Sequence, residues 1–185
     1  MTAFATYQEL EKRMSRTFTT TERVWVTELL EDSAEYMRGI IGQQVYPPQQ
    51  ITFQGWPDRG WVDLPATVVR SVDAVTFDGQ PVEWEQRLGS VRVGCNGPVA
   101  VTVSVGFSVA PRDLIALNCA LVSSQLLLVE AGLGLQLGGL SSVAIDDFKV
   151  AFADAGERTG GMSLPDHQQE YLRNRYGVSV FTTRG

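Results

Sequence analysis

The residue types that most often carry out nucleophilic or metal chemistry are scarce in this sequence. The single histidine, His167, stands beside Asp166, and the two cysteines, Cys95 and Cys119, lie far apart without a C-x-x-C spacing. An α/β-hydrolase would show a G-x-S-x-G turn, which the sequence lacks, and zinc sites draw mainly on histidine and cysteine. We therefore expect an exposed His167 near a helix start, two unpaired thiols and no metal site.

Two groups of acidic residues have spacings that could support acid–base chemistry. Glu83 and Glu85 would share one strand face on either side of Trp84, and paired carboxylates are the catalytic groups of glycosidases. A solvated edge strand explains the same spacing without chemistry. Asp146 and Asp147 adjoin each other in an alternating stretch, where a tight turn accounts for both. The carboxylates therefore predict no catalytic site.

Aromatic and glycine-rich segments leave one binding alternative open. Trp56, Trp61 and Trp84 fall in one β-rich region and could stack on sugars, although tryptophans in a small sheet more often fill its core. The segment "GLGLQLGG" follows a predicted helix and carries Leu137 where a dinucleotide-binding loop has its last glycine. The sequence thus predicts a protein that is not an enzyme and has no cofactor.

The composition is that of a globular chain without general affinity for nucleic acid. Of the 185 residues, 44% are hydrophobic and 19% are charged, with a net charge of −6, whereas nucleic-acid binders present a basic face. The N-terminus lacks a signal-peptide pattern. The most apolar stretch, residues 114–129, is shorter than the roughly 20 residues that span a bilayer. We expect a soluble protein made without export and without a membrane partner.

Capping signals predict two N-terminal helices. Thr6 with Glu9, and Thr19 with Glu22, form S/T-x-x-E boxes. A first helix is therefore expected over residues 7–14. A second, longer helix is expected to begin at the Thr19 box and to end near residue 41, with Gly42 after it. An apolar stripe in the second helix comprises Trp25, Val26, Leu29, Leu30, Ser33, Ala34, Met37, Ile40 and Ile41. This helix should pack on one side.

The middle of the chain combines a β-rich region with an apolar helix. Residues 51–107 are rich in valine and threonine, and we expect four to six short antiparallel strands in a small sheet. Asp78-Gly79 suits a tight hairpin turn, and the alternation over residues 99–107 places the valines and Phe107 on one face. The helix expected over residues 111–131 is apolar nearly all round, which predicts burial on all sides, in part against neighbouring copies.

Residues 141–156 alternate like a strand but lie between two helical segments. The expected faces are Phe148, Val150 and Phe152 on one side and Val143 and Ile145 on the other, with the change at Asp146-Asp147. The unpaired backbone groups of such a hairpin-like arm favour pairing with another subunit. An extra strand on the chain's own sheet is the alternative.

Together these elements predict an α+β fold in which a helical bundle carries an inserted antiparallel sheet. The expected parts are N-terminal helices (1–45), a β module (46–109), bundle helices with the arm at 141–156 (110–177) and a tail (178–185). The last helix is expected over residues 166–176, ended by Gly177.

The order of five segments carries a resemblance to a known family. They are "ATYQELEKRMSRTFTTTERVWVTELLEDSAEYMRGIIG", "LPATVVRSVDAVTFDGQPV", "APRDLIALNCALVSSQLL", "IDDFKVAFADAG" and "LPDHQQEYLRNRYG". In this order they resemble head-to-tail connector (adaptor) proteins of long-tailed bacteriophages, closest to those of actinobacterial phages. Most of the chain is covered.

The resemblance implies a structural protein of the virion neck. A connector-type bundle would form a ring, a dodecamer matching the portal, and would extend the DNA channel towards the tail. Its partners would be the portal protein, a stopper or tail-terminator protein below, and genomic DNA that passes through without specific binding. The acidic balance suits such a channel.

The arm and the tail are the expected contact segments of this ring. Phe148, Val150 and Phe152 would contact a neighbouring subunit or an adjacent ring. The tail would dock on the portal through Val178, Val180 and Phe181, with Arg184 reaching an acidic patch.

Three other functions remain open at this point. Another neck protein, such as a stopper or tail-completion protein, would share most of these features, although the helix-rich ends favour the adaptor. A carbohydrate-binding module or hydrolase would use the tryptophan-rich sheet. A DNA-binding regulator is disfavoured by the net charge of −6 and by the lack of a basic helix.

Overall fold

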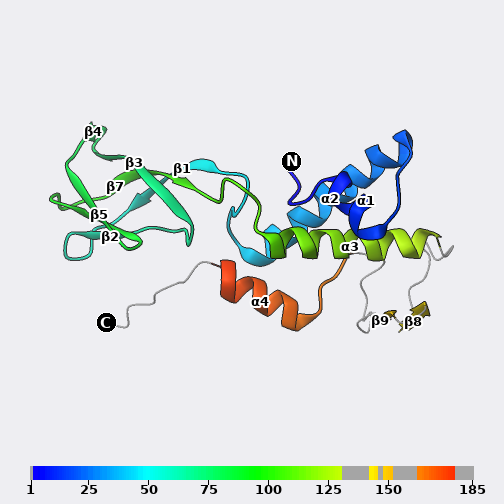
Figure 1. Cartoon of the computed structure of the whole chain (residues 1–185). Coiled ribbons are helices and arrows are strands. Elements are labelled where there is room, and N and C mark those ends of the chain that lie inside the picture. Colours follow the sequence, from blue (N-terminus) through cyan, green and yellow to red (C-terminus); the bar gives the residue numbers. More distant parts are fainter. Residues whose placement is uncertain (1, 131–141, 146–147, 152–161, 178–185) are drawn as a thin grey trace. The chain divides into compact units, whose positions relative to one another are not determined.

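The computed structural model describes residues 2–130, 142–145, 148–151 and 162–177 (Figure 1). Within these residues there are four helices, two antiparallel sheets of four and three strands, and one two-stranded hairpin. The predicted α+β class is confirmed. The chain divides into two compact units, Met1–Met37 with Pro111–Tyr171 and Arg38–Ala110 with Leu172–Gly185, and each is described by itself below.

The first helix, α1 (Tyr7–Met14), begins at the predicted capping box. The backbone amide of Glu9 donates to the Thr6 hydroxyl at 3.3 Å, and the Glu9 carboxylate accepts from the Thr6 amide at 2.8 Å. Two donors that a helix start leaves without partners are thus satisfied. The helix ends at Ser15, whose φ of 50° lies in the left-handed region.

The second helix, α2 (Thr20–Ile41), repeats the device at Thr19 and Glu22. The Glu22 carboxylate accepts from the Thr19 amide and from the Thr19 hydroxyl, each at 2.7 Å. These bonds, with a smaller contribution from Arg16, lower the pKa of Glu22. At the other end Gly42 has a φ of +77° and donates to the Arg38 carbonyl at 2.8 Å, as predicted.

The predicted apolar stripe of α2 is narrower than expected. The buried members are Val26, Leu30, Ser33, Ala34, Met37 and Ile41. Leu29 and Ile40 are only half-buried. Trp25 is 38% exposed, so its inclusion in the packed stripe was wrong. At 3.6 residues per turn, Trp25 lies far from the centre of the face formed by the buried members.

The core of the first unit joins α1 and α2 to α3 (Arg112–Glu130). Its buried members are Ala5, Leu10, Phe18, Val26, Leu30, Cys119, Val122 and Leu126. The helix α4 (Asp166–Tyr176) begins in this unit, where the Tyr36 hydroxyl accepts from the Leu164 amide at 3.1 Å. Buried apolar area of this kind is the main source of stability in a small helical unit.

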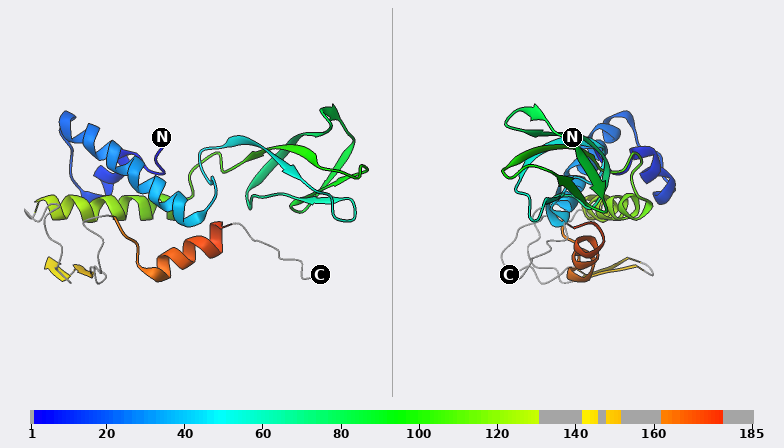
Figure 2. Two further views of the ribbon diagram at one scale, coloured as in Figure 1. Left: turned by 180° about the vertical axis from the view of Figure 1, so that it is seen from behind. Right: turned by 90° about the vertical axis from the view of Figure 1, so that its left-hand side faces the viewer.

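The β module of the second unit contains seven strands in two sheets, not four to six in one. The strands are β1 (Gln49–Gly55), β2 (Trp61–Asp63), β3 (Val69–Phe77), β4 (Gln80–Pro81), β5 (Trp84–Arg87), β6 (Ser90–Val93) and β7 (Val99–Val105). The orders are β1-β7-β3-β4 and β2-β6-β5, and both views in Figure 2 show β1, β7 and β3 side by side. The short second sheet was missed because every residue of β5 is exposed, which removes the alternation that signals a strand.

The interior of the β module is built mainly from valines. Val99, Val101, Val103 and Val105 of the central strand β7 are all buried, as the alternation predicted. Asp78 and Gly79 both have positive φ and connect β3 to β4, which confirms the predicted turn. Phe107 does not share the valine face and is 37% exposed. The backbone turns at Gly106, where φ is +90°, before Phe107 is reached.

Candidate assembly surfaces

The residues whose side chains could carry out catalysis or bind a metal are not brought together in the part of the chain that the structure describes. His167 is exposed in the first turn of α4. Glu85 is exposed in β5, and Glu83 is exposed just before it, which matches the solvated edge. No group of three or more histidine, cysteine or carboxylate residues among the described positions is arranged to hold a metal ion.

The two thiols have different surroundings. Cys119 is buried in the core of the first unit, and this burial raises the pKa of its thiol to about 11. Cys95 is half-buried against the valine core of the β module. A thiol with a raised pKa forms little of the reactive thiolate near neutral pH, so Cys119 acts as a small apolar side chain.

The tryptophans are not the core residues that the sequence suggested. Trp56 is 74% exposed and Trp84 is 38% exposed, and Trp61 is half-buried. The interior is already filled by valines from both sheets. Space is so short where β1 meets β2 that a Cβ on Gly55 would lie 2.2 Å from a methyl of Val62.

A polar row crosses the outer face of the larger sheet and was not identified from sequence. Gln50 of β1, Ser104 of β7 and Ser71 of β3 are register partners across the three strands. All three donate to the Asp73 carboxylate, at 2.8 Å from Gln50, 2.6 Å from Ser104 and 2.7 Å from Ser71. These bonds, that of Ser104 first, hold the pKa of Asp73 below its usual range. A shallow hollow beside the row is lined by Pro48, Gln49, Gln50, Arg70, Ser71 and Ser104.

Asp73 occupies a bulge in β3, and the regular alternation of a strand therefore does not reveal the row. The register between β3 and β7 shifts between Val72 and Ala74, so Asp73 is an extra residue without a register partner on β7. A bulge can redirect a side chain across its sheet. Since the carboxylate is satisfied by three donors, the row is a structural network.

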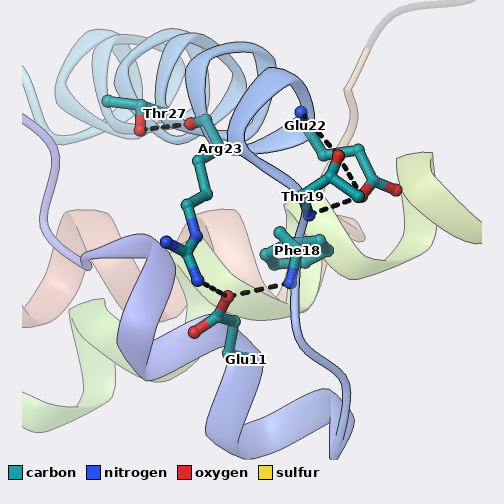
Figure 3. A network of polar contacts seen from close by, with 6 residues as sticks. All are labelled: Glu11, Phe18, Thr19, Glu22, Arg23 and Thr27. Atoms are coloured by element: carbon teal, nitrogen blue, oxygen red, sulfur yellow. Dashed lines mark hydrogen bonds and ion pairs between the residues drawn. The ribbon is translucent and has the colours of Figure 1, made fainter.

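The connection between α1 and α2 is held by Glu11, as Figure 3 shows. Its carboxylate accepts from the Phe18 backbone amide at 2.8 Å and pairs with Arg23 at 3.3 Å. Arg23 in turn lies over the Tyr7 ring at 5.1 Å, and Arg16 pairs with Glu22. This polar network fixes the short link that starts α2.

One side of α3 faces away from the core of the first unit. Ala120 and Leu127 are exposed, and Ala116 and Ser123 are half-buried. These positions are spaced i, i+4, i+7 and i+11, so they share one face of the helix, and none carries a charge. We call these four residues the α3 outer stripe. In the single chain α1 and α2 pack against another face of α3, so its burial on all sides, which was expected in part against neighbouring copies, stays a prediction.

The predicted arm is a hairpin of its own, formed by β8 (Ser142–Ile145) and β9 (Phe148–Ala151). The register pairs Ile145 with Phe148 and Val143 with Val150. Positions directly opposite each other in an antiparallel pair lie on the same face of the sheet, so the assignment of these residues to opposite faces was wrong. Within the described residues β8 and β9 pair with each other, and pairing with another subunit and addition to the chain's own sheet both stay predictions.

Several predicted contact residues lie outside the described part of the chain. These are Phe152 of the arm, the Asp146-Asp147 tip, and Val178, Val180, Phe181 and Arg184 of the tail. Phe148 and Val150 are described as positions in β9.

The residue that precedes the tail is anchored to the second unit. The carbonyl of Gly177 accepts from the Thr67 hydroxyl at 2.7 Å. Gln43 connects Thr67 to the end of α4, because its side-chain amide donates to the Thr67 hydroxyl at 3.0 Å and to the Tyr176 carbonyl. The Tyr176 ring also meets Phe107 edge-on at 6.4 Å. The end of α4 is therefore a fixed starting point for residues 178–185.

Comparisons with known proteins place no constraint on the function. No protein-family model matches the chain, and no curated protein sequence matches it. Among the described residues, no helix combines the length and the apolar character that crossing a membrane requires.

Proposed function

We propose that this protein is a head-to-tail adaptor of a long-tailed bacteriophage, a structural connector-type subunit without catalytic activity. Copies of the chain would form a cyclic ring, a dodecamer matched to the portal, at the neck of the virion. The ring would extend the DNA channel and join the capsid to a stopper or tail-terminator protein below. The segment order described above is the source of this proposal.

The observation that carries it is the presence of two different open surfaces in the first unit. The α3 outer stripe is uncharged, and its four residues are exposed or half-buried in the single chain; the hairpin β8–β9 pairs with no other strand of the described residues. A closed ring of identical subunits requires two different complementary surfaces on each copy. Three of its residues, Ala116, Ala120 and Ser123, are small, which allows a neighbouring element to approach closely.

Charge supports the same proposal. The net charge of −6 opposes adhesion of the phosphate backbone, which suits a channel through which DNA slides. Portal docking is assigned to the tail, with Val178, Val180 and Phe181 as apolar anchors and Arg184 as the charged contact.

A second candidate, a stopper or another neck protein, is favoured by one observation. The β module has seven strands in two sheets, which is a larger β component than the sequence predicted. The helix-rich ends favoured the adaptor, so a larger β component favours the stopper. The two proteins differ in what they bind, because an adaptor binds the portal directly, whereas a stopper binds a portal that already carries its adaptor.

The test is co-sedimentation with the purified portal ring of the same phage, using the full chain and a variant truncated after Gly177. Binding by the full chain that is lost on truncation supports the adaptor and places the contact in the tail. Equal binding by both supports the adaptor and removes the tail assignment. Binding only to portal rings already loaded with another neck protein supports the stopper, and no binding in any form, with both proteins folded, rejects both.

A further inference from the structure

We infer that the open edge of β1 is the receptor for the β8–β9 hairpin of a second copy of this chain. The inference rests on the proposed ring, and it adds the surface on which one subunit holds the next. It assigns the contact to backbone pairing between two strands.

The first observation is that β1 is an unprotected edge strand. It lies at the end of the order β1-β7-β3-β4 and pairs with β7 over all seven residues without a register shift. Outside that ladder, no backbone hydrogen bond between described residues involves Gln49–Gly55. Its residues are all exposed or half-buried, so nothing in the described chain covers this edge.

The second observation is that the other edges of the module carry features that prevent pairing. The pairing of β3 with β7 has two register shifts, β4 contains Pro81, and β5 has Glu85 and Arg87 among its four residues. The remaining edge, β2, has only three residues and ends in Asp63. Bulges, prolines and charges are the usual protection of edge strands. The strand β1, QQITFQG, has none of them. It is therefore the edge best suited to accept another strand.

The third observation concerns the hairpin itself. It consists of four residues paired with four, and an isolated two-stranded hairpin is at best marginally stable in water. A third strand would satisfy one of its outer edges. Of its two strands, β8 (SVAI) has no charge whereas β9 (FKVA) carries Lys149, so β8 is the expected partner of the uncharged β1.

The connections to the hairpin allow it to reach another subunit. Residues 131–141 join it to α3, and residues 152–161 lead away from it. At about 3.3–3.6 Å per residue, each connection spans at most roughly 35 Å. A closed ring places a second copy beside each chain, so a second copy is the occupant that we assign to β1.

The test is a mixed disulfide experiment on the full chain in a Cys95→Ser background. One preparation carries Thr52→Cys in β1, and the other carries a cysteine at Ser142, Val143 or Ala144 in β8, which scans the register. The matched control replaces Thr52→Cys with Gln86→Cys on the charged edge β5. Each variant is first checked for native circular dichroism and melting, and mixtures are oxidised both alone and on the portal ring.

The expected result is a cross-linked dimer in at least one β1–β8 mixture, with no dimer from the β5 control or from either preparation alone. Two outcomes overturn the inference. One is a cross-link that forms only within a chain, seen in a third preparation that carries Thr52→Cys and the β8 cysteine in the same molecule, and the other is no cross-link in any register under either condition. Portal binding without the cross-link would overturn this inference but keep the adaptor proposal. A cross-link without portal binding would support the pairing of β1 with β8 but reject the adaptor proposal.

Discussion

Asn118 of α3 accepts a hydrogen bond from the backbone amide of Ala5, 113 residues earlier in the chain, at 2.9 Å. The same side chain donates to the Leu30 carbonyl at 3.0 Å and to the Ser33 hydroxyl. Asn118 and Ser33 are fully buried. One side chain thus connects the N-terminal segment, α2 and α3. Buried polar groups of this kind are costly unless all their bonds are made, so they favour one arrangement of the helices over others.

Replacing Asn118 should therefore destabilise the helical unit strongly. In Asn118→Leu the buried Ala5 amide loses its acceptor and the Ser33 hydroxyl loses a partner, and we expect a loss of about 2–4 kcal/mol in the free energy of unfolding. Urea unfolding followed by circular dichroism measures it. The matched control is Asn174→Leu at an exposed position of α4, with an expected change below about 0.5 kcal/mol. Equal effects in the two variants would contradict the connecting role of Asn118.

The polar row on the larger sheet predicts how the stability of the β module changes as the pH falls. The pKa of Asp73 is lowered first by its bond from Ser104 and then by those from Gln50 and Ser71. A carboxylate with a lowered pKa contributes stability above the usual aspartate range, and this contribution is lost as the pH falls through the pKa of the folded state. In Ser104→Ala the pKa of Asp73 should move up towards the usual value. A carboxyl ¹³C titration by NMR measures the shift, with Thr102→Ala on the same strand as the control.

An unchanged pKa for Asp73 in Ser104→Ala would contradict this account. On acidification, the melting temperature of Ser104→Ala should begin to fall at a higher pH than that of the parent chain, because the variant begins to lose the contribution of Asp73 at a higher pH. Asp73→Asn should remove this part of the acid sensitivity altogether.

Local signals in the sequence were sufficient to predict the helix ends. The capping boxes at Thr6 and Thr19, the turn at Asp78-Gly79 and the glycine after α2 depend on neighbours within four residues, and all four are observed. The alternation in β7 was also sufficient to identify its buried valines.

Features that depend on distant residues were not predictable in the same way. The second sheet needs β2 to meet β6, about thirty residues later. The Asp73 row needs a bulge in β3 at Asp73 and a serine, Ser104, on the neighbouring strand β7 within reach of its carboxylate. Trp56 was expected in the core, but it is exposed, and the interior is filled by valines that come from both sheets and from distant positions in the sequence. The surfaces proposed for assembly were suggested by incomplete burial and by an unpaired hairpin, and their partners lie outside the single chain.

The two cysteines should differ sharply in reactivity. Burial raises the pKa of Cys119 to about 11, and the side chain is 2% exposed, so we expect it to react with a thiol reagent such as DTNB only after unfolding. Cys95 is half-buried and should react first in the native chain. Labelling of the native Cys95→Ser and Cys119→Ala variants at pH 8 assigns each rate. Rapid labelling of native Cys95→Ser would contradict the buried position of Cys119.

A charge on the α3 outer stripe should prevent assembly without unfolding the subunit. Ala120 is exposed in the single chain, so Ala120→Arg should change the free energy of unfolding by less than about 0.5 kcal/mol. At a subunit interface the same arginine would be buried without a partner, which is strongly unfavourable, so rings should be lost. Mass photometry, alone and on the portal ring, measures the assembled fraction. The control is Asp32→Arg at an exposed position of α2, which adds positive charge outside the stripe and should leave assembly intact. If Ala120→Arg formed rings as readily as this control, the contact between subunits would have to lie elsewhere, and the hairpin and β1 would remain as the surfaces to test.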